Sequence, residues 1–185
     1  MLEIEFKNML SEAEYHFLMA HFGKVGQALP QTNVYFDTAG NDLKKNRMSL
    51  RIRKTVSGFE LTLKQPHESG GKLETNQDLS EVDAEKIENL LGFVEGPVKA
   101  ILNGIGINPD QLNVVGYLVT DRVEFPYEGG TLFLDHSKYN GKEDFELEFE
   151  AESYKEGLLT FQSVLAKFQI PVRHGVSKIK RATTP

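Results

Sequence analysis

The sequence predicts a mainly β, α+β protein: a closed eight-stranded antiparallel β-barrel with helices packed outside. Many short segments alternate between apolar and charged residues, which is typical of half-buried strands. Turn residues such as Ser57-Gly58 and Asn140-Gly141 separate neighbouring segments closely enough for hairpins. The charged sides of several strands carry runs of one sign, which favours an enclosed, functional face over an ordinary wet surface.

Eight segments fit strands, and most of the connections between them are short. They are read from the alternation, from turn residues and from their content of β-branched and aromatic residues. The segments are 2–8, 32–37, 47–56, 59–65, 72–78, 114–125, 131–137 and 143–151.

Segments whose apolar residues recur at helical spacing lie between the predicted strands. The segment 11–22 begins with Ser11 and Glu14, a capping box, and 80–91 begins at Ser80 with acidic residues in its first turn. A second capping box, Ser153 with Glu156, opens the helix predicted at 153–168. Short helices are expected at 97–103 and from Asn108-Pro109.

Size and composition favour one domain, residues 1–185, with an ordinary globular composition. No cysteine is present, which excludes disulfides and thiolate metal ligands and agrees with a cytoplasmic location. No apolar stretch has the length of a membrane span, and the N-terminus does not resemble a signal peptide. The net charge of −6 argues against a nucleic-acid polymer as partner, although a local cationic pocket would still bind a small anion.

Alternation assigns the charged residues to one side of each strand. Glu3, Glu5 and Lys7 oppose apolar residues on the first strand. The remaining strands follow the same rule, with Arg51 and Arg53, then Glu60 and Lys64, then Arg122 and Glu124, then Asp135, and last Glu146, Glu148 and Glu150.

The ordinary explanation is an antiparallel sheet with one dry and one wet face. Same-side neighbours lie about 6.7 Å apart, so each like-charged pair costs roughly 2.5 kcal/mol at an effective dielectric of about 20. Surface strands more often mix signs. Closing the sheet would instead place five cations and eight carboxylates in one lumen, where a polyanion bridged to Mg²⁺ or Mn²⁺ would offset their desolvation. For Arg51 and Arg53 a surface ion pair with Glu146 or Glu148 stays an alternative. For Glu146, Glu148 and Glu150 a solvated acidic strand stays an alternative, and it fits Glu150 better than the other two.

The order of motifs resembles the CYTH superfamily, also called triphosphate tunnel metalloenzymes, over residues 3 to about 181. The opening Glu3-Ile4-Glu5-Phe6-Lys7 matches its E-x-E-x-K signature. The later motifs are Tyr35-Phe36-Asp37-Thr38, Leu50-Arg51-Ile52-Arg53, Leu61-Thr62-Leu63-Lys64, Glu74, Thr120-Asp121-Arg122, Leu134-Asp135, Glu146-Leu147-Glu148-Phe149-Glu150 and Ser177-Lys178-Ile179-Lys180-Arg181. The chain is most similar to the uncharacterised CYTH proteins of low-GC Gram-positive bacteria.

The resemblance implies a charged tunnel and a role for each matching residue. Phosphate binding would fall to the cations Lys7, Arg51, Arg53, Lys64, Arg122 and Lys178. Divalent metal, Mg²⁺ or Mn²⁺, would be held by Glu3, Glu5, Asp135, Glu146 and Glu148. The catalytic assignments are Lys7, which positions the phosphates or water, and Glu5. Glu74 would orient a basic neighbour. For Tyr35 and Asp37, a packing or turn role and a role in the site are both open.

Three functions stay open. The first is metal-dependent hydrolysis of inorganic tripolyphosphate, thiamine triphosphate or a nucleoside triphosphate. The second is an adenylate cyclase, in which the 3′-hydroxyl attacks the α-phosphorus. The third is a non-catalytic polyphosphate or nucleotide binder. The partner expected in each case is a small triphosphate, without a membrane or nucleic-acid polymer. A homodimer is the commonest assembly in general, but no pattern here indicates it.

Overall fold

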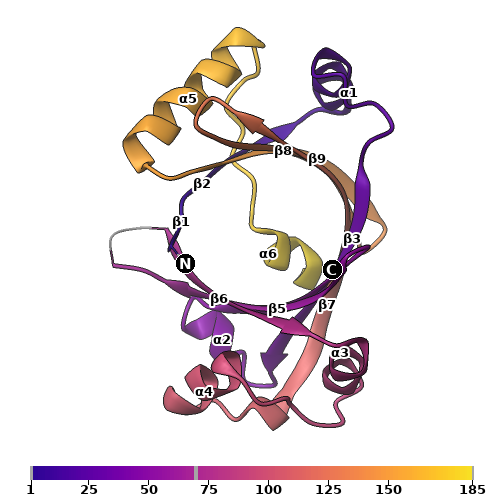
Figure 1. Ribbon diagram of the computed structural model, residues 1–185, viewed down its shortest axis with the longest axis vertical. Helices are drawn as coiled ribbons and strands as arrows, with labels where there is room; N and C mark the ends of the chain where they lie inside the picture. The colour runs from indigo at the N-terminus through magenta and orange to yellow at the C-terminus, as the bar shows by residue number, and fades with distance from the viewer. Residues whose placement is uncertain (1, 69–70, 185) are drawn as a thin grey trace. The chain divides into compact units, whose positions relative to one another are not determined.

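The computed structural model describes residues 2–68 and 71–184 as a β-rich chain with helices between the strands (Figure 1). The strands are β1 (Leu2–Glu3), β2 (Glu5–Leu10), β3 (Leu29–Thr38), β4 (Ser49–Thr55), β5 (Gly58–Pro66), β6 (Lys72–Leu79), β7 (Leu112–Tyr127), β8 (Gly130–Tyr139) and β9 (Lys142–Ala151). The helices are α1 (Glu12–His21), α2 (Asp42–Lys45), α3 (Glu81–Glu88), α4 (Pro97–Gly104), the 3₁₀ turn η1 (Pro109–Gln111), α5 (Tyr154–Lys167) and α6 (Lys178–Thr183).

The strands hydrogen-bond in the order β1-β6-β5-β4-β3-β7-β8-β9-β2. The pairs β4–β5, β5–β6, β7–β8 and β8–β9 are antiparallel neighbours in sequence, as the short turns predict. The pair β2–β9 instead joins two strands that are remote in sequence, also antiparallel. The sequence predicted eight strands, whereas the described residues form nine, because the expected strand 2–8 divides at Ile4 into β1 and β2.

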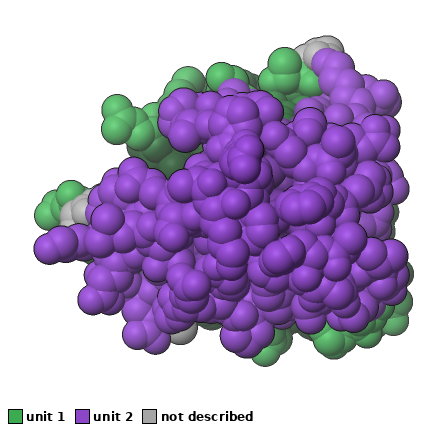
Figure 2. Space-filling view, turned by 90° about the horizontal axis from the view of Figure 1, so that it is seen from above, with its two compact units in different colours: residues 1–2, 31–118, 178–185 green, residues 3–30, 119–177 purple. Residues whose placement is uncertain are grey.

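Contacts divide the chain into two compact units (Figure 2). Unit 1 comprises residues 1–2, 31–118 and 178–185, and unit 2 comprises 3–30 and 119–177. The strand β7 runs from the first unit into the second.

In unit 2 the apolar sides of β2, β8 and β9 form a core with α1 and α5, which both pack on β2 and β9. Leu18, Leu132, Leu134 and Leu147 are completely buried there. Gly157 on α5 permits the close approach, since a Cβ on it would lie 2.6 Å from the Cβ of Ala151 on β9. The alternation predicted from the sequence therefore gives this half-sheet one apolar and one charged side.

Unit 1 repeats this arrangement with different elements. Leu50, Ile52, Leu61 and Leu63 on β4 and β5 are fully buried against the helices. The helix α2 packs on β4, and α3 and α4 pack on β5 and β6. The helix α6 approaches β7 at Gly116, where a Cβ would come within 2.6 Å of the Ala182 carbonyl oxygen.

The three predicted helix starts, at Ser11, Ser80 and Ser153, are confirmed, but one of the two predicted capping boxes is wrong. Ser11 and Glu14 form both bonds of the capping box, and the Ser80 hydroxyl accepts a bond from the Asp83 N–H. Ser153 precedes α5 but its side chain makes no capping bond, so the second box does not form. No helix in the described part of the chain is both long and apolar enough to cross a membrane.

Candidate functional site

The predicted site residues fall into two groups, one in each unit. Unit 2 brings together Glu3, Glu5 and Lys7 from the N-terminal strands with Arg122, Asp135, Glu146 and Glu148 from β7, β8 and β9. Unit 1 holds Arg51, Arg53, Lys64 and Lys178. The sign-sorting seen along single strands thus extends to the units, with most carboxylates in one and most cations in the other.

Strand register aligns the acidic residues of unit 2. Lys7 lies opposite Glu148, and Asp135 lies between Glu146 on β9 and Arg122 on β7. Residues directly opposite each other in antiparallel strands have Cβ atoms about 4.5–5.5 Å apart. Side chains that are far apart in sequence are therefore held within reach of a single ion.

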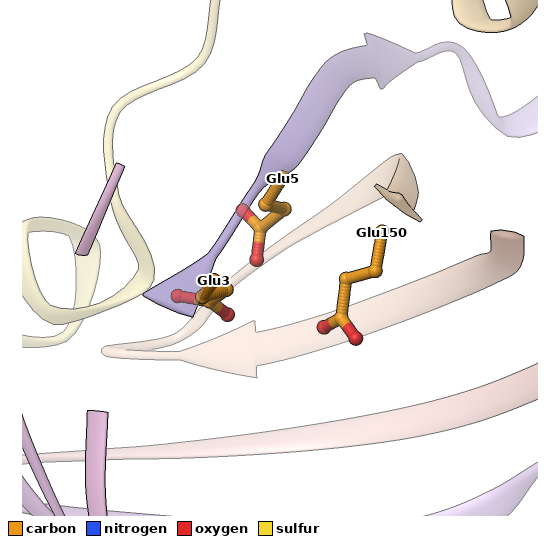
Figure 3. Close-up of side chains that lie close together, drawn as sticks. All are labelled: Glu3, Glu5 and Glu150. Carbon is orange, nitrogen blue, oxygen red and sulfur yellow. The ribbon is translucent and has the colours of Figure 1, made fainter. Parts of the chain in front are cut away.

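One group of carboxylates comprises Glu3, Glu5 and Glu150, from β1, β2 and β9 (Figure 3). One oxygen from each lies within 4.8 Å of the others, and all three residues are half-buried. Glu5 and Glu150 are opposite each other in the β2–β9 pair. Of the three β9 glutamates, Glu150 is the one that the sequence places most readily in solvent, whereas the structure groups it with Glu3 and Glu5. The sequence did contain a signal for this position, because Glu150 follows Glu146 and Glu148 at the two-residue spacing that places all three on one side of β9.

The second group comprises Asp135, Glu146 and Glu148, again with one oxygen each within 4.8 Å. It is deeper, because Asp135 and Glu146 have no exposed surface and Glu148 is 2% exposed. Burying carboxylates is expensive unless cations or hydrogen-bond donors compensate them. Arg122 and Lys7 compensate two of the three, Asp135 and Glu148.

Arg122 binds two of these carboxylates at once. Its Nε and Nη2 donate to Asp135 Oδ1 and Oδ2 at 2.7 and 2.6 Å, and Nη2 also donates to Glu148 Oε2 at 2.5 Å. The guanidinium carbon lies 4.4 Å from the ring centroid of Phe133, a cation–π contact. Burial lowers the pKa of Arg122, but the charges of Asp135 and Glu148 outweigh it and raise the pKa well above its usual value.

Lys7 supplies the second cation of unit 2. Its Nζ forms an ion pair with Glu5 and lies 3.3 Å from Glu148 Oε1. Its side chain is 33% exposed, whereas that of Glu148 is 3% exposed. Lys7 therefore links the half-buried and the buried carboxylate groups, and its ammonium remains accessible to a ligand.

In unit 1 the cations lie on the polar sides of β4 and β5. Arg51 is opposite Tyr35 and Thr62, and Lys64 is opposite Glu74, with which it forms an ion pair. This agrees with the expectation that Glu74 orients a basic neighbour. Arg53 Nε donates to Asn33 Oδ1 at 3.4 Å.

Arg51 has one feature that matters for binding. Its Nε atom is buried and has no hydrogen-bond partner among the described residues. Leaving a buried donor unsatisfied costs about 1–3 kcal/mol, and more when the group is charged. A bound anion would remove this cost.

The two residues left open by the sequence are structural. Asp37 is buried and accepts hydrogen bonds from the backbone N–H groups of Thr38, Leu43 and Lys44, at 2.8, 2.9 and 3.1 Å. It thereby holds the start of α2. Tyr35 is 3% exposed, in keeping with a packing role.

Lys178 begins α6, a helix that the sequence did not predict. The terminal basic run offers no apolar periodicity of useful length. The helix forms because Arg181 and Ala182 are buried in unit 1, next to Gly116.

The donor sets fit a hard divalent cation. Mg²⁺ and Mn²⁺ prefer oxygen ligands, and each carboxylate group offers three from separate residues. The guanidinium and ammonium groups of β4 and β5 match phosphate oxygens in charge and geometry. The chemistry available is charge stabilisation and alignment of a polyanion rather than nucleophilic catalysis by the protein.

Comparison with known proteins gives a consistent result. The sequence profile of the CYTH domain matches residues 1–183. The Bacillus subtilis protein named "Putative triphosphatase YjbK" is 42% identical over 183 residues, which is 97% of this chain and 93% of that protein.

Solved structures agree with the fold. A Bacillus halodurans protein described as a "putative adenylate cyclase" has a TM-score of 0.93 at 40% identity, covering 97% of this chain and 96% of its own. A Hippeastrum protein, HpAC1, described as having a dominant triphosphatase activity, has a TM-score of 0.78 at 24% identity, covering 97% and 94%. The predicted fold class, an antiparallel barrel with helices outside, is confirmed, with nine strands in place of eight.

Proposed function

This chain belongs to the CYTH family, and we propose that it is a divalent-metal-dependent triphosphatase acting on a small triphosphate. The observation that carries the proposal is the gathering of six carboxylates into two groups in unit 2. A structural protein has no use for so many like charges in partly desolvated positions. The relative named as a triphosphatase, at 42% identity, supports the same activity.

We assign the metal to the carboxylates and the phosphates to the cations. Glu3, Glu5, Asp135, Glu146 and Glu148 would hold Mg²⁺ or Mn²⁺, and Glu150 joins them on the strength of its position beside Glu3 and Glu5. Bound metal would polarise the phosphate and lower the pKa of water near it.

Phosphate oxygens would be bound by Arg51, Arg53, Lys64, Arg122 and Lys178. The buried, unsatisfied Nε of Arg51 supports this, since an oxyanion is the partner it lacks. Glu74 keeps the Lys64 ammonium in place. Lys7, paired with Glu5 and exposed enough to contact a ligand, would position the terminal phosphate or the attacking water.

The reaction proposed is attack by the water oxygen on the terminal phosphorus. A new P–O bond forms as the bond to the bridging oxygen breaks, and the bridging oxygen leaves with the shortened phosphate chain. Such transfers need mainly alignment and charge stabilisation. A carboxylate, for which we propose Glu5, takes the proton of the water.

Cyclase activity is the second candidate, because a 40% identical solved structure carries that description. The same cations would bind ATP, but the 3′-hydroxyl would attack the α-phosphorus. Products separate the two: hydrolysis releases orthophosphate, and cyclisation releases pyrophosphate with cyclic AMP.

The test is to incubate the protein with tripolyphosphate, thiamine triphosphate or ATP, with Mg²⁺, with Mn²⁺ or with a chelator. Phosphorus NMR then identifies the products. Metal-dependent orthophosphate release supports the proposal. Cyclic AMP supports the cyclase, and binding without turnover in any metal would indicate a non-catalytic binder.

Matched variants test the site itself. Arg53→Ala should raise the KM for the triphosphate, whereas Lys54→Ala, the next residue, should not, because Lys54 pairs with Glu88 at 2.8 Å. Glu148→Gln should raise the metal concentration needed for activity. Glu143→Gln on the same strand should not, because Glu143 pairs with His136 on the surface. Equal activity in all four variants would refute the assignment.

The proposal also covers which metal supports activity and where in the cell the protein acts. We expect Mg²⁺ to support activity and Mn²⁺ to replace it, since both take oxygen ligands. We propose a cytoplasmic site of action, where a small triphosphate substrate is available.

A further inference from the structure

Arg122 has more protein contacts than phosphate binding alone would require. It makes three short hydrogen bonds to Asp135 and Glu148, and its planar face lies on the Phe133 ring. Its side chain is 11% exposed. Arg122 is thus the counter-ion of two residues assigned above to the metal.

The ion pairs engage every oxygen of these two carboxylates. Both oxygens of Asp135 accept from Arg122, and Glu148 uses Oε2 for Arg122 and Oε1 for Lys7. Arg122 and Lys7 also place two positive charges beside a group of three negative ones. A dication approaching this group is therefore repelled by the cations and competes with them for the same oxygens.

We propose that Arg122 is an exchangeable counter-ion: it occupies Asp135 and Glu148 until metal arrives, and metal binding requires it to leave them for the phosphates. This inference rests on the proposed function. The guanidinium fork that fits a carboxylate also fits a phosphate, so a triphosphate offers Arg122 an equivalent partner. Metal and phosphate should then favour each other's binding, because each removes an obstacle to the other.

Phe133 has a defined part in this exchange. It is an apolar residue on the polar side of β8, directly opposite Glu148 and Glu124. A ring supports the guanidinium from its face and leaves all of its N–H groups free to change partners. Phe133 is thus a positioning residue for Arg122 in both states.

The experiment measures Mn²⁺ binding to the full chain without any phosphate, by the loss of the electron paramagnetic resonance signal of free Mn²⁺. Arg122→Gln should bind Mn²⁺ about tenfold more tightly or better than wild type, since a charge next to a dication is removed. The control is Lys138→Gln, which removes one positive charge from an exposed pair with Asp121 in the same unit. Screening by solvent should limit its effect to less than about twofold.

Two further readouts cover a loss of folding. Arg122→Lys keeps the charge but cannot make the two-pronged bond to Asp135, so it should bind Mn²⁺ with intermediate affinity. If Arg122→Gln does not fold in chelator, the proposal requires that Mn²⁺ restore its circular dichroism spectrum, because the ion replaces the missing cation. The rescue must occur at Mn²⁺ concentrations below those that half-saturate wild type, because any ligand of the folded state stabilises it by mass action.

The outcomes separate the two proposals. Tighter Mn²⁺ binding by Arg122→Gln, or its rescue by Mn²⁺, supports the exchange. Equal or weaker binding by the variant overturns the exchange and leaves the triphosphatase assignment standing. Absence of Mn²⁺ binding by wild type and variant alike overturns both.

Discussion

The buried triad of Arg122, Asp135 and Glu148 allows a quantitative prediction about stability. Asp135→Asn keeps the shape and one acceptor oxygen, but its new NH₂ group faces an N–H donor of Arg122. One of two hydrogen bonds to a charged group is lost, worth about 1.5–3 kcal/mol, and the guanidinium loses a neutralising charge. Because Arg122 retains Glu148 and Phe133, we expect a loss of about 2–4 kcal/mol in the free energy of unfolding.

Replacing the whole triad with apolar residues should not lower the free energy of unfolding in this way. With Arg122→Met, Asp135→Leu and Glu148→Met together, the three charges of the triad are removed as a set, and Lys7, which loses Glu148, keeps its ion pair with Glu5. Apolar replacement of buried ion networks is often neutral or stabilising, so the triple variant should lie within about 1 kcal/mol of wild type or above it. Activity should be lost entirely, since two of the proposed metal ligands and one proposed phosphate ligand are removed.

The assay is equilibrium unfolding in urea at neutral pH with chelator present, extrapolated linearly to water. Wild type, Asp135→Asn and the triple variant are compared, and the comparison requires that all three have the same dependence of the free energy of unfolding on urea concentration. The reasoning is refuted if Asp135→Asn costs less than about 1 kcal/mol, or if the triple variant is less stable than Asp135→Asn.

Three further predictions concern the scaffold. Gly157→Ala should destabilise the chain by about 1–3 kcal/mol in urea unfolding, because a Cβ would lie 2.6 Å from a side chain on β9. The control is Gly104→Ala on α4, whose Cβ would meet nothing within 4 Å and which should be neutral or stabilising. Asp37→Ala removes the acceptor of three backbone N–H bonds and should cost about 2–4 kcal/mol, with the KM for triphosphate unchanged in the folded fraction. The hydrogen bond from Arg173 lowers the pKa of Glu14 below its ordinary 4.5, so this pair stabilises the chain above that pH and the contribution is lost as pH falls through the lowered pKa. The melting temperature of Glu14→Gln should therefore fall below that of wild type at neutral pH and converge with it in acid; a constant difference would contradict the linkage.

Much of the site could be predicted from period-two alternation, because the pleat of a strand dictates the face of each residue. Arg51, Arg53, Lys64 and the carboxylates of β9 all follow it. Register between remote strands could not be predicted: nothing local indicates that Lys7 lies opposite Glu148, or that Glu150 joins Glu5. These contacts depend on how β2 and β9, which are remote in sequence, align in the folded sheet.

The helix α6 and the contact of Phe133 with Arg122 could not be predicted from the sequence either. The helix α6 forms from a basic run without apolar periodicity, and its formation depends on burial beside β7. An aromatic residue on a charged strand face looks like an exception to the pattern, and only the position of Arg122 explains it. The failed capping box at Ser153 makes a similar point, because the motif was present but its side chain makes no capping bond.

The charges of unit 2 explain why the fold retains this arrangement. Its polar side carries six grouped carboxylates, and the two cations Lys7 and Arg122 leave an excess of four negative charges within that set. Each like pair at a strand repeat of about 6.7 Å opposes folding by roughly 2.5 kcal/mol at an effective dielectric of about 20. Apolar replacements would relieve that repulsion, so stability alone does not select these residues. A dication is attracted by the same excess, and the repulsion released on its arrival adds to its affinity. The electrostatic cost of these grouped carboxylates and the metal affinity that we propose for them are thus two consequences of one arrangement of charge.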